Sequence, residues 1–303
     1  VTDLNTREKD EHGTYIQRRV ARDDFGTNPC SEIILRSREF CNLSEVVIRH
    51  NDTRESLRDK VRIATILGTF QSTLTNFKYL SKEWQRNCEE ERLLGVSLTG
   101  IMDSPLTNGT KDTIKKLLNE LREVAVKTNI EYAEKLGIER SASITCVKPS
   151  GTVSQLVDSA SGIHARHNPY YIRTVRADNK DPLCKMMKAE GFPNEPDVTK
   201  PEHTTVFSFP AKSPKGATCR NDMTAWKQLS LWHTYAKEWC EHKPSVTVSV
   251  KEDEWVNTSA WVYDNFDDIS GISFLPFSDH TYKQAPYQDC TEKEYKELLN
   301  KMP

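Results

Sequence analysis

A thiol and a carboxylate lie close together in residues 28–32 (N-P-C-S-E) of this 303-residue chain. If residues 30–32 are extended, Cys30 and Glu32 point to the same side, because side chains alternate along a strand. Such a pair would place a sulfur and a base on one face of a substrate. A second thiol, Cys41, follows eleven positions later in the run C-N-L-S. Taken alone, these residues favour a buried cysteine beside a surface glutamate.

A second group of candidate residues is 148–155 (K-P-S-G-T-V-S-Q), which follows a β-rich run ending at Val147. A tight turn of small, hydroxylated residues between a strand and a helical pattern can bind a phosphate through backbone N–H groups. The run is not a Walker loop, because G-x-x-x-x-G-K-[ST] is absent. The alternative is an ordinary strand-to-helix turn capped by Ser150 or Thr152.

Histidines and cysteines elsewhere in the sequence are weaker candidates, as possible metal ligands. His164 lies near His167, and Cys240 near His242, but neither pair has a second pair at the spacing of a zinc site. Surface or core side chains are therefore favoured, and we expect no metal site.

Hydrophobic periodicity indicates the elements that position these residues. It predicts helices over 53–80, 112–136 and about 223–242. We expect Asp52 or Thr53 to cap the first helix, and Gly137 to end the second. Branched and aromatic runs predict strands over 142–147, 171–175, 204–209, 246–250 and 272–275. This alternation favours an α/β architecture with at least partly parallel strands, in one domain.

Composition excludes several functional classes. With 42 basic and 44 acidic residues the net charge is -2, without the basic excess of nucleic-acid or membrane-surface proteins. No apolar run approaches the roughly 20 residues of a membrane helix. Residues 1–13 lack a signal-peptide pattern and an initiating Met, so we expect the chain to begin partway through a longer protein. Eight cysteines without a secreted framework predict free thiols in the cytoplasm.

Taken together, the motifs resemble the second half of the catalytic barrel of the adenosylcobalamin-dependent (class II) ribonucleotide reductases, most closely the ribonucleoside-triphosphate reductases. N-P-C-S-E-I is similar to the finger-loop motif N-x-C-x-E, and F-C-N-L-S-E-V to the strand with a reducing cysteine. K-P-S-G-T-V-S-Q-L-V-D-S-A-S-G-I-H resembles the substrate-phosphate loop and the segment after it. Residues 268–287 (D-I-S-G-I-S-F-L-P-F-S-D-H-T-Y-K-Q-A-P-Y) resemble the cobalamin-dependent branch. The resemblance covers nearly the whole chain from about Asn28 onward.

The resemblance implies part of a ten-stranded α/β barrel with the catalytic cysteine on a finger loop. Cys30 would be the thiyl-radical site that abstracts the ribose 3′-hydrogen, and Glu32 would take the 3′-hydroxyl proton, which eases loss of the 2′-hydroxyl as water. Asn28 would orient the ribose hydroxyls or Glu32. Cys41 would supply reducing equivalents as half of a thiol pair that ends as a disulfide. The substrate phosphates would be held by Ser150, Gly151, Thr152 and Val153.

Two absences identify the branch. The glycyl-radical branch has a C-terminal glycine motif and usually lacks the finger-loop glutamate, whereas this chain has Glu32 and no such motif. The diiron-dependent branch has a tyrosine pair in a strand that matches residues 245–250, which contain no tyrosine. The resemblance therefore implies thiyl-radical reduction of ribonucleoside triphosphates to 2′-deoxyribonucleotides for DNA synthesis. It implies adenosylcobalamin as cofactor and thioredoxin or another dithiol as reductant.

Two alternatives stay open: the large subunit of a diiron-dependent ribonucleoside-diphosphate reductase, and a catalytically silent nucleotide-binding module. The family also has parts that this sequence lacks. These are the partner of Cys41, the allosteric specificity site, much of the barrel and a C-terminal cysteine pair. We therefore expect residues 1–303 to be the C-terminal part of the catalytic barrel, with the N-terminal portion of the same enzyme as a partner.

Overall fold

The structure, a computed structural model, describes residues 6–9, 15–20, 24–277 and 282–303. The chain forms two compact units, each built from two separate stretches of sequence. The first unit is Val1–His164 with Met223–Pro276, and the second is Ala165–Asp222 with Phe277–Pro303. No shift in composition marked these boundaries. Most of the polar N-terminal run, and residues 278–281 of the motif 268–287, lie outside the described residues.

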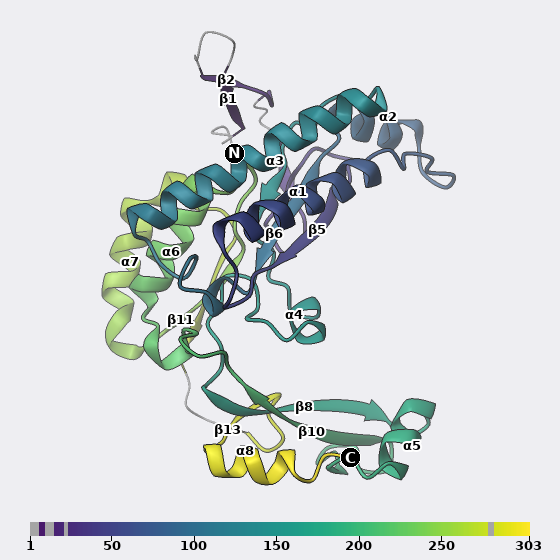
Figure 1. The fold of residues 1–303 in the computed structure, drawn as a ribbon, viewed down its shortest axis with the longest axis vertical. Helices are drawn as coiled ribbons and strands as arrows, with labels where there is room; N and C mark the ends of the chain where they lie inside the picture. The colour runs from purple at the N-terminus through teal and green to yellow at the C-terminus, as the bar shows by residue number, and fades with distance from the viewer. Residues whose placement is uncertain (1–5, 10–14, 21–23, 278–281) are drawn as a thin grey trace. The chain divides into compact units, whose positions relative to one another are not determined.

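Parallel strands form the centre of the first unit (Figure 1). One sheet has the order β5 (Asn42–Val47), β6 (Leu94–Thr99) and β7 (Thr145–Cys146), and a second pairs β11 (Val246–Val250) with β12 (Ile272–Pro276). A parallel bridge between Val147 and Pro244 connects the two, with the Ser245 N–H donating to the Val147 carbonyl at 2.9 Å. The strands therefore follow one another in the order β5-β6-β7-β11-β12, which confirms the predicted parallel arrangement.

Helices α1 (Arg54–Gln71), α3 (Asp112–Leu136), α6 (Ala225–Glu238) and α7 (Trp255–Asp264) pack on one face of these strands (Figure 1). The same unit also contains α2 (Lys82–Glu91), and the single turn α4 (Val153–Leu156) follows β7. Alternate strand residues enter the core between the sheet and the helices, among them Leu94, Val96, Leu98, Val246, Val248 and Val250. Trp232 and Tyr235 of α6, and Trp239 directly after it, are fully buried there.

The opposite face of the strands, called here the inner face, carries small and polar residues. Because side chains alternate along β6, Gly95, Ser97 and Thr99 point away from the helices. Ser97 is in register with Glu45 on one neighbouring strand and with Cys146 on the other. Along β6 this face therefore carries small and polar residues, and the Leu43 and Ile33 side chains pack over Gly95.

The first predicted helix is shorter than expected. Thr53 caps α1 as predicted, accepting a hydrogen bond from the Ser56 N–H, but the helix ends at Gln71, not near residue 80. The hydroxyls of Ser72 and Thr73 bond back to the Thr69 and Phe70 carbonyls, which competes with continued helix. Apolar residues near its end are accordingly not in the core: Leu67 is 61% and Phe70 48% exposed.

The other two helix predictions hold more closely. α3 spans Asp112–Leu136, and Gly137 ends it in the left-handed conformation with φ 65°, as predicted. α6 ends at Glu238, earlier than the predicted residue 242. The chain leaves the helix because the N–H groups of Glu241 and His242 both bond the Thr145 carbonyl, at 3.1 and 2.9 Å.

The second unit is built on an antiparallel sheet. Its order is β13 (Tyr287–Asp289), β8 (Tyr170–Asp178), β10 (Thr204–Lys212) and β9 (Asn194–Pro196). Helices α5 (Pro182–Ala189) and α8 (Glu292–Leu299) belong to the same unit. The strands predicted over 171–175 and 204–209 exist in longer form and pair with each other directly. Among the described residues, no helix is long and apolar enough to cross a membrane.

Two short hairpins precede the parallel strands. The first pairs β1 (Arg7–Lys9) with β2 (Tyr15–Gln17), and the second pairs β3 (Gly26–Thr27) with β4 (Ile34–Leu35), both antiparallel. The loop between β3 and β4 contains the motif N-P-C-S-E.

Candidate active site

The loop that carries Cys30 is closed by Asn28. The Asn28 N–H donates to the Ile33 carbonyl at 3.2 Å, and the Asn28 side-chain oxygen accepts from the Ile33 N–H at 3.1 Å. Inside this ring, the Ser31 N–H donates to the Asn28 carbonyl at 2.9 Å. Asn28 is therefore a structural part of the loop, which holds Cys30 in a defined turn.

The condition under which Cys30 and Glu32 would point to the same side, an extended chain over residues 30–32, is not met. Ser31 is in the left-handed region with φ 63°, so residues 30–32 form a turn instead of a strand. Cys30 is exposed, whereas Glu32 is only 1% exposed. The turn packs against Gly271, where a Cβ would lie 2.5 Å from the Ser31 Cβ. The loop therefore presents the thiol outward and the carboxylate inward.

His242 fixes the base of the loop to the sheet. Its Nδ1 accepts from the Ile34 N–H at 3.3 Å, and its Nε2 lies 2.9 Å from the Leu94 carbonyl. This pair of contacts requires a neutral ring with the proton on Nε2. Burial, and then the charge of Arg19, lower the pKa of His242 to about 3, so the ring is neutral at physiological pH. The next residue makes a further link to the loop: the Lys243 N–H donates to the Glu32 carbonyl at 3.0 Å.

The Glu32 carboxylate is buried with unused hydrogen-bonding capacity. Its Oε2 has no partner in the part of the chain that the structure describes. A buried acceptor without a donor costs free energy unless a ligand or water supplies one. An acceptor of this kind is suited to receive a proton from a hydroxyl group.

Cys41 lies beside the inner face, at the start of β5. Its Sγ is 3.2 Å from the position that a Cβ on Gly95 would occupy, so the glycine leaves room for the thiol. Burial raises the pKa of Cys41 well above its usual value, and Glu39 and then Glu32 raise it further. Cys41 is therefore a thiol at neutral pH, within electrostatic reach of the Glu32 carboxylate.

Sequence reasoning did not single out a third thiol near this site. Cys146 lies on the inner face next to Ser97, and burial, followed by Cys41, raises its pKa well above the usual value. The signal that could have found it is its position at the end of a strand, two residues before the K-P-S-G-T motif.

The predicted phosphate loop is not an ordinary capped turn. Neither predicted capping side chain works as a cap: α4 has no side-chain cap hydrogen bond, and the buried Ser150 Oγ has no partner among the described residues. Ser150 is left-handed with φ 53°. Gly151, Thr152 and Val153 are exposed. The loop therefore offers hydroxyl and backbone groups that the described protein does not use.

The segment after the loop contacts the backbone of the first loop residues. The Ser161 hydroxyl donates to the Pro149 carbonyl at 2.6 Å, and a Cβ on Gly162 would lie 2.3 Å from the Lys148 carbonyl oxygen. Only glycine fits at position 162, where φ is 54°. Ser161 and Gly162 therefore pack directly against the first residues of the loop.

The histidines considered as metal ligands are occupied by other partners. The His164 Nε2 accepts from the Thr247 N–H at 3.0 Å, and the His167 Nε2 contacts Asp289 at 2.7 Å. Cys240 is fully buried. Across residues 6–9, 15–20, 24–277 and 282–303, no three such side chains gather in a way that could hold a metal ion.

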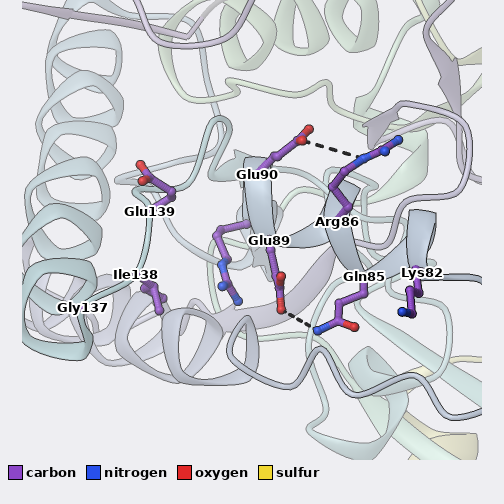
Figure 2. Close-up of a pocket in the computed structure, with 9 residues that line it drawn as sticks. Lys82, Gln85, Arg86, Glu89, Glu90, Gly137, Ile138 and Glu139 are labelled. Atoms are coloured by element: carbon purple, nitrogen blue, oxygen red, sulfur yellow. Dashed lines mark hydrogen bonds and ion pairs between the residues drawn. The ribbon is translucent and has the colours of Figure 1, made fainter.

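A surface pocket of about 440 Å³ lies elsewhere, between α2 and the end of α3 (Figure 2). Charged and polar side chains dominate its lining: Lys82, Gln85, Arg86, Glu89, Glu90 and Arg92, with Gly137, Ile138 and Glu139. The Glu89 side chain accepts a hydrogen bond from Gln85 within it. None of the predicted site residues lines this pocket.

Comparison with known proteins gives relatives over most of the chain, although no family model matches it. The adenosylcobalamin-dependent ribonucleoside-triphosphate reductase of Euglena gracilis is 30% identical over 284 residues, which cover 92% of this chain and 38% of that protein. The reductase of the same name from Lactobacillus delbrueckii subsp. bulgaricus is 29% identical over 306 residues, covering 90% and 40%. The chain thus spans about two fifths of the length of these relatives.

Solved structures show the same fold. A B-12 dependent (class II) ribonucleotide reductase matches with a TM-score of 0.81 at 24% identity, over 92% of this chain and 42% of that chain. The alpha subunit of the class Id ribonucleotide reductase of Actinobacillus ureae matches with a TM-score of 0.51 at 14% identity, over 82% and 53%. The expected α/β fold of ribonucleotide reductases is confirmed. Over about nine tenths of its length, the chain is homologous to the family of adenosylcobalamin-dependent ribonucleoside-triphosphate reductases.

Proposed function

We propose that this chain carries the catalytic site of an enzyme that reduces ribonucleoside triphosphates to 2′-deoxyribonucleotides for DNA synthesis. The observation that carries the proposal is the arrangement around one loop: an exposed thiol at Cys30, a buried carboxylate at Glu32 whose Oε2 has no partner among the described residues, and a protonated thiol at Cys41. A nucleotide-binding module without catalysis needs none of these three groups. The homology over most of the chain supports the same reading.

The parallel strands β5-β6-β7-β11-β12 are proposed as one half of the ten-stranded barrel, with the Cys30 loop as its finger loop. Helices on one face and small polar residues on the other fit a barrel wall whose interior holds a substrate. The N-terminal portion of the same enzyme would supply the other half and the partner of Cys41.

The proposed chemistry assigns one role to each reactive group of the loop. When bound, adenosylcobalamin supplies the organic radical that takes the hydrogen atom of a thiol. The exposed Cys30 thiol is accessible to such a radical, and β11 contains no tyrosine for a radical relay, so the residues fit this cofactor. The Cys30 sulfur then takes the ribose 3′-hydrogen. The Glu32 carboxylate receives the 3′-hydroxyl proton, which promotes loss of the 2′-hydroxyl as water.

The remaining residues complete the reaction and hold the substrate. Cys41 would give reducing equivalents and end in a disulfide, which thioredoxin or another dithiol reopens. The loop of Ser150, Gly151, Thr152 and Val153 would bind the triphosphate through its exposed amides and the Ser150 hydroxyl, which has no partner in the described part of the chain. The eight free cysteines fit a reducing cytoplasm, where we expect the enzyme to act.

The test is an assay of the complete enzyme containing this chain, with a ribonucleoside triphosphate, a dithiol and adenosylcobalamin as the only radical source. We expect deoxyribonucleotide to form without a second protein. A requirement for a radical-generating partner protein would support the diiron-dependent alternative. Nucleotide binding without any product would support the silent module.

A further inference from the structure

The chain leaves the parallel sheet at the start of the proposed phosphate loop. Val147 still pairs with the stretch that leads into β11: its N–H donates to the Lys243 carbonyl at 3.3 Å, and its carbonyl accepts from the Ser245 N–H at 2.9 Å. Continued parallel pairing would next use the N–H and the carbonyl of residue 149. That residue is Pro149, which has no N–H, so the ladder of hydrogen bonds ends there.

This departure leaves one donor of β11, the Thr247 N–H, without a strand carbonyl. Every second N–H of a strand points to the same neighbouring strand, so Thr247 follows Ser245 on the edge that faces β7. Continued pairing would direct its N–H to the Pro149 carbonyl. It donates instead to the Nε2 atom of His164, at 3.0 Å. The imidazole of His164 thus takes the place of a strand carbonyl.

The Pro149 carbonyl, which the strand does not use, is bonded by Ser161. The Ser161 hydroxyl donates to it at 2.6 Å, and the Ser150 carbonyl also lies within reach at 3.2 Å. The Ser161 carbonyl in turn lies 2.9 Å from His164 Nδ1 and accepts from the His164 backbone N–H at 2.9 Å. One chain of hydrogen bonds therefore runs from Thr247 through His164 and Ser161 to the first residues of the phosphate loop.

These contacts admit one form of the His164 ring. A backbone N–H donates and a carbonyl accepts, so Nε2 is unprotonated and Nδ1 carries the hydrogen. Burial lowers the pKa of His164 below its usual value, which agrees with a neutral ring. The Gln228 side chain holds the same segment from α6, since it donates to the Ile163 carbonyl at 3.1 Å. Residues 161–164 are thereby attached to both α6 and β11.

We propose that His164 is a positioning residue that sets where the phosphate loop lies and so tightens binding of the substrate triphosphate. This role rests on the proposed function, because it takes residues 150–153 as the groups that bind the phosphates. His164 acts through Ser161, whose hydroxyl holds the carbonyls of Pro149 and Ser150, directly before the amides of the loop. Without this link the substrate itself would have to order the loop, which weakens binding.

His164→Ala in the complete enzyme tests this role, because alanine removes both ring contacts. We expect the Kd and the KM for CTP, a ribonucleoside triphosphate, to rise about 10-fold, while kcat changes less than about 2-fold. If the ring served only the general stability of the fold, kcat and the unfolding temperature would fall without this selective rise in KM. His164→Gln should recover part of the affinity, because its side-chain oxygen can still accept from Thr247.

A matched control is His233→Ala in α6 of the same unit. His233 contacts the Asp268 side chain at 3.0 Å, and Kd, KM and kcat should all be unchanged when it is replaced. If His164→Ala does not fold, the same comparison uses His164→Asn, which can still donate to the Ser161 carbonyl but offers no acceptor to Thr247.

A double-mutant cycle shows whether His164 and Ser161 act in one chain. Ser161→Ala should also raise the Kd for CTP, and the double variant should bind CTP about as weakly as the weaker of the two single variants, because either change breaks the same link. Calorimetric titration with CTP measures all four proteins and needs no turnover.

An unchanged Kd for CTP in the His164 variants, or additive effects in the cycle, would overturn the role of His164. The proposed function can fail separately. A wild-type enzyme that binds CTP but forms no deoxynucleotide would overturn the proposed reaction, while the Kd values would still decide the role of His164. A wild-type enzyme that does not bind CTP would overturn both.

Discussion

The Nδ1 atom of His242 accepts a hydrogen bond from the backbone N–H of Ile34, 3.3 Å away. Ile34 begins the strand directly after the Cys30 loop, and the other ring nitrogen of His242 contacts the Leu94 carbonyl in β6. One neutral imidazole thus fastens the loop to the central strand of its sheet. Protonation of the ring would remove the acceptor that Ile34 uses.

The lowered pKa of His242 predicts how the stability of the folded chain depends on pH. Its pKa is about 3 in the folded chain, below the ordinary value of 6.5. The unfolded state therefore binds more protons between these values, so the stability that His242 contributes is complete above pH 6.5 and is lost as the pH falls towards 3. The slope for one proton is about 1.4 kcal/mol per pH unit.

His242→Gln should remove this contribution, because glutamine can accept from Ile34 and donate to Leu94 but cannot be protonated. Denaturant unfolding of both proteins from pH 7 to 4 measures it. We expect the unfolding free energy of the wild type to fall relative to that of the variant as the pH falls. A constant difference across the range would show that His242 does not titrate as described.

Cys30→Ser should abolish nucleotide reduction in the complete enzyme, because a serine O–H bond is too strong for the residue to act as a radical carrier. Cys30 is exposed at the tip of its loop, so folding and substrate binding should change little. The measurements are deoxynucleotide formation, thermal unfolding and nucleotide affinity. Appreciable turnover by the variant would rule out Cys30 as the radical site.

Cys41→Ser should have a different effect, because a reducing thiol is needed to finish the cycle but not to start it. We expect the variant to release or exchange the substrate 3′-hydrogen, with breakdown of the nucleotide instead of clean product. Isotope release from a 3′-tritiated substrate provides the measurement. If release also vanished, Cys41 would have a role other than electron donor.

Gly271→Ala should disturb the Cys30 loop from outside it. The new Cβ would lie 2.5 Å from the Ser31 Cβ, at a residue whose φ is 60°. Strain at such a position costs about 1–3 kcal/mol, and the loop must move to relieve it. We expect lower stability together with a marked loss of turnover. Gly26→Ala in the same hairpin is the control, since no atom lies within 4 Å of its Cβ position.

Residues 1–303 alone should form no deoxynucleotide with adenosylcobalamin and a dithiol, because the proposed site needs a partner thiol for Cys41. Adding the N-terminal portion of a class II reductase in trans should restore product and raise the unfolding temperature. Calorimetry and product assays on each piece and on the mixture provide the test. Multiple turnovers by the isolated chain would require another reductant among its own cysteines.

The sequence predicted those parts of the fold that depend on local patterns. The bounds of α3 and its Gly137 cap followed from apolar spacing and one glycine, and the strand 246–250 from its branched residues. The orientation of Cys30 and Glu32 could not be predicted this way. It depends on a left-handed Ser31 that is set by Asn28 within the loop and by the packing of Gly271, which is 240 positions later in sequence.

The supporting residues of the site were missed for a similar reason. His242 acts on two backbone groups, so no side-chain motif marks it. Glu39 is two residues from Cys41 in sequence, but Arg19, 3.6 Å from its carboxylate, comes from the segment before β3. Charges from distant segments become a cluster only after folding.

The interleaved order of the two units also affects how the chain is made. β7 ends at Cys146, and its neighbour β11 begins at Val246, about one hundred residues later, after nearly all of the antiparallel sheet. At a synthesis rate of roughly 5–20 residues per second, the ribosome needs on the order of 5–20 seconds to deliver β11 after β7 has emerged. During that interval one edge of β7 is without its partner and open to mispairing with other chains. Chaperone capture of the nascent chain would be most valuable in this window.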